Sequence, residues 1–131
     1  MIRAVLLIVK KDDMVIFVRR AKWRRSLPGA WSLPAEMVVR DEVLEEAAKR
    51  CAWNELGVKV EVEQIADELF SDEEKTLYFV RCKIIEGEPT LEFTDELDKL
   101  EYMGINEFFT RHEDSQIGHG LQYLRRHPEL W

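Results

Sequence analysis

The chain has 131 residues, of which 46% are hydrophobic and 34% are charged. This composition excludes intrinsic disorder as the default state and predicts a single domain, residues 1–131, with its own core. Only two cysteines, Cys51 and Cys82, are present, which excludes a disulfide scaffold and favours a reducing, cytoplasmic location. No stretch approaches the ~20 apolar residues of a membrane span, so no membrane partner is expected.

The net charge of −7 is unevenly distributed. Residues 1–40 carry nine Lys and Arg against three Asp and Glu, whereas residues 41–131 carry ten against twenty-three. An acidic chain repels duplex nucleic acid, so that partner is disfavoured. The basic run at residues 19–25 could instead hold the phosphates of one small ligand, and a solvated loop is the alternative.

Two apolar runs, residues 2–9 and 14–18, flank a polar four-residue segment and predict a β-hairpin. A basic loop follows, and then a short strand at residues 31–33 that ends at Pro34. Residues 41–56 have apolar positions three and four apart, which predicts a helix with Asp41 as its N-cap. Gly57 is placed to form a left-handed C-terminal cap.

After Gly57, alternating valines and charged residues predict a strand whose phase slips at residues 65–66, as at a bulge. A polar turn is expected at residues 71–74, a central strand at residues 76–85 and a last strand at residues 100–105. Ile117, Leu121 and Leu124 mark one face of a C-terminal helix. This order predicts an α/β (α+β) fold, with a mixed sheet between helices.

Residues 33–58 resemble the Nudix box, G-x5-E-x7-R-E-U-x-E-E-x-G-U, in which U is aliphatic. The positions that match are Glu42, Arg50, Ala52 (loosely), Glu55, Gly57 and Val58. The box has Gly, Glu and Glu where this chain has Glu36, Cys51 and Asn54. The upstream Trp31-x-Leu33-Pro34 also resembles the approach to the box in the Nudix, or MutT-like, hydrolase family.

The resemblance implies a Nudix-like fold and a ligand in which a nucleoside diphosphate is linked to another moiety. It also implies Mg²⁺ or Mn²⁺ bound by carboxylates on one helix face, here Cys51, Asn54 and Glu55, of which only Glu55 is a carboxylate. A loop carbonyl is a further ligand in the family, which points to Ala35. The Glu36 carboxylate could replace a lost ligand, or it could be a solvated surface group.

Further roles follow from the same resemblance. Glu42 and Arg50 match a pair that braces the loop against the helix, and Glu96 lies where the family often has an additional ligand or base. Because the substrates are polyanions, the basic run gains a predicted binding role. The residues expected to bind substrate are Arg19, Arg24 and Arg25 for phosphates and Trp23 or Tyr102 for a base.

Two functions remain open from the sequence. The first is a Nudix-like module that binds a nucleotide-type ligand, with hydrolysis impaired by the loss of two metal-ligand carboxylates. The second is an active, divergent pyrophosphohydrolase whose site is rebuilt from Glu36, Glu42, Glu55 and Glu96. A homodimer is possible in either case.

Overall fold

The computed structural model describes residues 2–70 and 75–131, so the turn expected at residues 71–74 lies outside the described residues. The strands are β1 (Ile2–Lys11), β2 (Met14–Arg20), β3 (Trp31–Ser32), β4 (Ala35–Met37), β5 (Lys59–Phe70), β6 (Lys75–Glu86) and β7 (Leu97–Met103). The helices are α1 (Leu44–Leu56), α2 (Ile105–Arg111) and α3 (His119–Arg126), with short 3₁₀ turns at Asp114–Gln116 and Pro128–Leu130. None of the helices in the described ranges is long and apolar enough to cross a membrane.

The sheet is mixed, with strand order β3-β2-β1-β6-β5, while β4 pairs with β1 and β7 pairs with β2. β1 runs parallel to β6, and the remaining pairs are antiparallel. The predicted hairpin is present, but β1 and β2 pair only at its tip, through Lys10 with Val15 and Lys11 with Met14. Beyond the tip the two strands separate and carry the two halves of the sheet.

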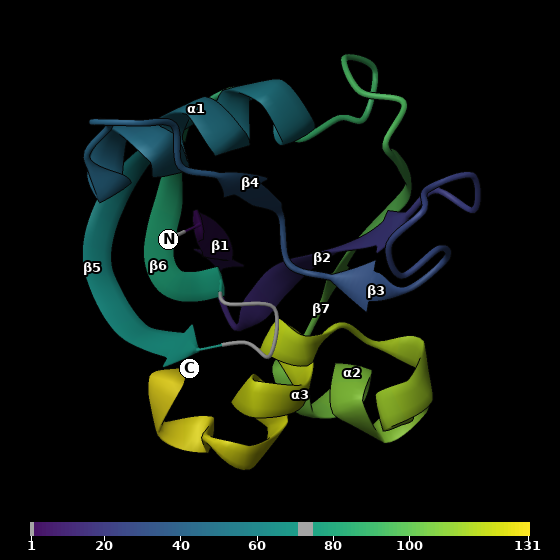
Figure 1. Cartoon of the computed structure of the whole chain (residues 1–131). Helices are drawn as coiled ribbons and strands as arrows, with labels where there is room; N and C mark the ends of the chain where they lie inside the picture. The colour runs from purple at the N-terminus through teal and green to yellow at the C-terminus, as the bar shows by residue number, and fades with distance from the viewer. Residues whose placement is uncertain (1, 71–74) are drawn as a thin grey trace.

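The layers place α1 over one face of the sheet and α2 and α3 over the other (Figure 1). Both faces are therefore covered, which explains why residues 4–9 of β1 are buried without interruption. The prediction of a mixed sheet between helices is confirmed. Two elements were not predicted: the three-residue strand β4 and the helix α2, whose Ile105 and Phe108 are buried one turn apart.

The start of α1 differs from the prediction. Val43, not Asp41, occupies the N-cap, and it makes no side-chain capping bond. Asp41 has a left-handed backbone with φ of 67°. Glu42, which would have belonged to the first turn, instead accepts a hydrogen bond from the backbone N–H of Val39. The residues before α1 are thus held as a loop by side-chain contacts.

The other end of α1 agrees with the prediction. Gly57 caps the helix in the left-handed conformation, with φ of 66°. A Cβ at Gly57 would lie 3.1 Å from the Phe93 ring, so the site favours glycine for space as well as for backbone conformation. β5 then follows, and its pairing with β6 shifts register between Ile65 and Asp67, where the sequence predicted a bulge.

Candidate functional site

Arg50 lies at the centre of a polar network between α1 and the loop that precedes it. Its Nε and Nη2 atoms donate hydrogen bonds of 2.9 and 2.8 Å to the two carboxylate oxygens of Glu42. Nη1 donates to Oε1 of Glu36 at 3.0 Å, and Nη2 also donates to the carbonyl of Met37 at 2.8 Å. The hydrogen bonds from Arg50 lower the pKa of Glu42 to about 2.

Glu36 projects from β4 into the same network. Both of its carboxylate oxygens accept hydrogen bonds from Nδ2 of Asn54, at 3.0 and 3.2 Å. Its side chain is only 20% exposed, so it is not a solvated surface group. The two departures from the Nudix box at positions 36 and 54 therefore contact each other directly.

Glu55 lies one residue further along α1 and is buried, with 6% of its surface exposed. The backbone N–H of Ala35 donates to its Oε1 at 3.0 Å. Burial raises the pKa of Glu55 to about 8; the hydrogen bond from Ala35 opposes this shift, and the charges of Glu36 and Glu96 reinforce it. Glu55 is accordingly a neutral carboxylic acid at pH 7.

Cys51 lies one helical turn before Glu55 on the same side of α1, and the expectation that both share a ligand face with Asn54 stays a prediction. Its side chain is fully buried in the core between α1 and the sheet, and burial raises the pKa of its thiol well above the usual value. Asn54 is exposed on the helix surface. Cys51 and Glu55 are therefore both covered by the surrounding protein, whereas Asn54 is not.

In the described structure, protein groups engage the polar side chains beside α1. Among residues 2–70 and 75–131, no group of three or more His, Cys, Asp or Glu side chains is placed to hold a metal ion. Burial raises the pKa of Glu55, the carboxylate of Glu36 accepts hydrogen bonds from Arg50 and Asn54, and Asn54 directs its N–H donors into the network. Mg²⁺ prefers anionic oxygen ligands, and here the carboxylates of Glu36 and Glu42 already bind Arg50.

The basic run predicted to bind phosphates contacts an acidic loop. Arg19 forms a bidentate pair with Asp98, with distances of 2.7 and 3.0 Å, and Arg24 approaches Glu96 at 3.7 Å. The backbone adds a hydrogen bond from the Ala21 N–H to the Glu96 carbonyl, at 2.9 Å. Two of the three arginines expected to bind substrate are thus paired with carboxylates, and Arg25 is exposed to solvent.

Arg20 belongs to this region and was missed by the sequence reasoning. It is half-buried at the end of β2, and its Nε donates to the carbonyl of Ser26 at 2.9 Å. Burial and the nearby charge of Arg24 lower its pKa, whereas Glu55 and Glu96 raise it. The sequence offered one signal for Arg20: it stands where the apolar strand ends and the basic run begins.

The two aromatic residues proposed for a base differ in environment. Trp23 is 64% exposed, and its indole Nε1–H donates to the carbonyl of Asp95 at 3.1 Å. Tyr102, on β7, packs against the core on the α1 side of the sheet. The hydroxyl oxygen of Tyr102 is buried, and within the described part of the chain it has no hydrogen-bond partner. Of these two residues, Trp23 therefore has the more exposed ring.

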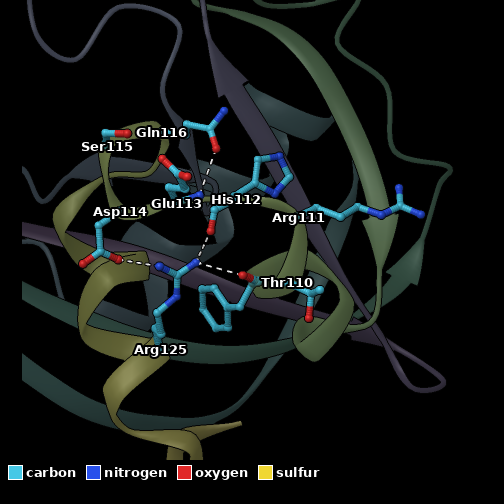
Figure 2. A pocket seen from close by; sticks show the side chains of 9 residues that line it. Thr110, Arg111, His112, Glu113, Asp114, Ser115, Gln116 and Arg125 are labelled. Atoms are coloured by element: carbon cyan, nitrogen blue, oxygen red, sulfur yellow. Dashed lines mark hydrogen bonds and ion pairs between the residues drawn. The ribbon is translucent and has the colours of Figure 1, made fainter.

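A hollow of about 620 Å³ lies on the other side of the sheet, at α2 and α3. Figure 2 shows Arg125 reaching from α3 toward Asp114 and toward main-chain oxygens near the end of α2. These oxygens belong to Phe109 and His112. Arg125 closes the end of α2 and joins it to α3, and none of the residues predicted for the site lines this hollow.

The fold and the loop–helix motif define a class, and comparison with known proteins identifies it. The NUDIX domain model matches residues 1–122. A MutT-like protein of Streptomyces ambofaciens is 33% identical over 58 residues, which cover 44% of this chain and 34% of that relative. The match therefore spans about a third of that relative's length.

Two solved structures show the same fold. A MutT protein from Methanosarcina mazei Go1 superposes with a TM-score of 0.77 at 19% identity, covering 98% of this chain and 93% of that chain. An ADP-ribose pyrophosphatase from Streptococcus suis 89-1591 gives a TM-score of 0.68 at 17% identity, covering 95% and 92%. The chain belongs to the Nudix family.

Proposed function

We propose that this protein binds a nucleoside diphosphate linked to another moiety and hydrolyses it poorly. The observation that carries the proposal is the state of the carboxylates beside α1. Both oxygens of Glu36 are hydrogen-bonded to Asn54, and one of them also to Arg50, while Glu55 is buried and neutral. Without anionic oxygens free to hold a cation, the acceleration that a metal gives to phosphoanhydride hydrolysis is lost.

The ligand's phosphates would bind beside the loop of residues 19–25. Arg24 and Glu96 lie near Arg20 and Glu55, close enough for their charges to act on the pKa values of Arg20 and Glu55. A diphosphate that displaced Glu96 from Arg24 would exchange a weak contact of 3.7 Å for charge-assisted hydrogen bonds. Trp23, with its exposed ring, would stack on the base.

The alternative is an active enzyme that uses Mg²⁺ or Mn²⁺. One observation favours it: the negative charges of Glu36 and Glu96 both act on Glu55, so three carboxyl groups lie in one neighbourhood. Activity would require Glu36 to leave Arg50 and Asn54.

The net charge of −7 favours a small nucleotide over a nucleic acid as ligand. Cytoplasmic location and a homodimer stay predictions.

ADP-ribose is a suitable probe, because it is a nucleoside diphosphate joined to a second sugar. We expect calorimetry to detect ADP-ribose binding with the same affinity in EDTA and in millimolar Mg²⁺. The turnover rate, measured as the release of AMP, should stay far below the order of 1 s⁻¹ that is common among enzymes. Turnover at that rate with Mg²⁺ or Mn²⁺ would establish the alternative, and absence of binding to ADP-ribose and ADP would refute the proposal.

A second measurement tests the basic loop. Replacing Arg24 with Ala should weaken ADP-ribose binding by about tenfold, the effect of losing ~1.4 kcal/mol of a charge-assisted contact. The salt dependence of binding should also become shallower. Arg111→Ala is the matched control, because Arg111 is an exposed arginine on α2 that is paired with Glu107 at 3.0 Å. Equal affinities for the two variants would exclude Arg24 from the binding site.

A further inference from the structure

The two departures from the Nudix box at positions 36 and 54 form a contact in the folded chain. The box has glycine and glutamate there, whereas this chain has a glutamate at 36 and an amide at 54. One amide nitrogen, Nδ2 of Asn54, donates to both carboxylate oxygens of Glu36, at 3.0 and 3.2 Å. One carboxylate is present at this contact, as in the box, but it comes from β4 instead of α1.

Asn54 is compatible with Glu36 because it supplies donors. A carboxylate at position 54 would face the carboxylate of Glu36 at hydrogen-bonding distance, and two charges so close cannot both be ionised without a large cost. Arg50 could not compensate fully, because its guanidinium already binds Glu42, Glu36 and the Met37 carbonyl. The residue at 36 therefore restricts the residue at 54.

The same contacts fasten the chain between β4 and α1. Arg50 and Asn54 lie about one turn apart on α1, and both reach Glu36 on β4. The carbonyl of Met37, at the end of β4, and the carboxylate of Glu42, in the following loop, bind Arg50 as well. Each of these bonds joins two protein groups, so the loop is held against the helix without a bound cation.

We propose that the departures from the Nudix box at Glu36 and Asn54 compensate each other, so that losing either one alone destabilises the fold. Together with Arg50, this pair holds the loop of residues 37–42 on α1 in place of a cation. Glu36 is thus a positioning residue for the loop. The inference rests on the proposed function only in taking this loop as a border of the ligand site. Its tests use stability and loop protection, so they do not depend on whether a nucleotide binds.

A double-mutant cycle tests the exchange, with all melting temperatures measured in EDTA. Asn54→Glu alone should lower the melting temperature by about 5 °C or more, because it brings two carboxylates into contact. Glu36→Gln alone should lower it by less, because a neutral amide still meets Arg50 and Asn54. The double variant E36Q/N54E reverses the donor and acceptor and should recover most of the loss caused by N54E.

Hydrogen exchange localises the effect. The amide of Val38 donates to the Arg3 carbonyl at 2.8 Å, and the amide of Val39 donates to Glu42 at 3.1 Å. Both amides should exchange faster in N54E and return towards the parent rate in E36Q/N54E, while the β6 amides that pair with β1 change little. Glu45→Gln is the control on α1, since Glu45 is exposed and contacts only Lys49 across one turn in the ion pairs described.

The outcomes separate the inference from its rivals. Additive effects of the two substitutions, with no recovery in the double variant, would show that positions 36 and 54 are uncoupled and would overturn it. A melting temperature of the parent that rises with added Mn²⁺ would also overturn it, because a cation would then be part of the loop–helix contact. Unchanged parent melting in Mn²⁺ together with recovery in the double variant would support it.

Discussion

Replacing Cys51 with Glu, the residue of the Nudix box, is expected to lower the free energy of unfolding by about 3–5 kcal/mol, the usual cost of an unpaired buried charge. The thiol of Cys51 is fully buried between α1 and the sheet. A carboxyl group there would lie near those of Glu36 and Glu55, which reinforce the rise in the Cys51 pKa that burial causes. Urea unfolding at neutral pH measures the loss directly.

Cys51→Ala is the matched control for this experiment. Removing the sulfur leaves a small cavity and should cost about 1–2 kcal/mol, so the difference between the two variants isolates the effect of the carboxyl group. Adding Mg²⁺ or Mn²⁺ should not restore the Glu variant. Equal stability of the Glu and Ala variants would mean that position 51 faces solvent, and the described packing of α1 would be wrong.

Glu55→Gln is expected to remove a pH dependence of stability between about pH 4.5 and pH 8. Burial raises the pKa of Glu55 from 4.5 to about 8. Below pH 4.5 the native and unfolded chains both hold this proton, and between the two values only the native chain keeps it. Stability contributed by Glu55 is therefore present at low pH and is lost as pH rises towards 8.

The Gln variant keeps an acceptor for the Ala35 N–H but cannot ionise. Near pH 9 it should exceed the parent's free energy of unfolding by roughly 5 kcal/mol, and near pH 5 the two should differ by less than about 1 kcal/mol. Glu46→Gln, an exposed glutamate on the same helix, is the control and should leave the pH profile unchanged. Parallel pH profiles for the parent and Glu55→Gln would show that the pKa of Glu55 is the same in the native and the unfolded chain.

Much of the architecture could be predicted because local patterns encode it. Continuous apolar runs predicted buried strands, and the three- and four-residue spacing after Asp41 predicted α1. Gly57 was predicted as a left-handed cap because few other residues adopt that conformation cheaply. The family motif in residues 33–58 predicted the fold, since its spacing ties one loop to one helix.

Other features depended on contacts between distant residues. The helix α2 was missed because seven residues with two buried positions give little periodic signal. Asp41 was not the cap, because Glu42 was drawn to Arg50, eight residues away. The charges of Arg19 and Arg24 were predicted from the basic run, but the acidic partners that bind them lie more than seventy residues further along the chain.

The site shows the same division. The sequence by itself determined that positions 36, 51 and 54 depart from the Nudix box, and therefore that the donor set is altered. Only the tertiary structure decided what the replacements do: Cys51 enters the core, Glu55 becomes a neutral acid, and Glu36 binds Asn54. The physical reason is that burial and hydrogen bonding depend on which surfaces meet. The helical period determines which residues share a face of α1, but it does not determine which parts of that face the rest of the protein covers.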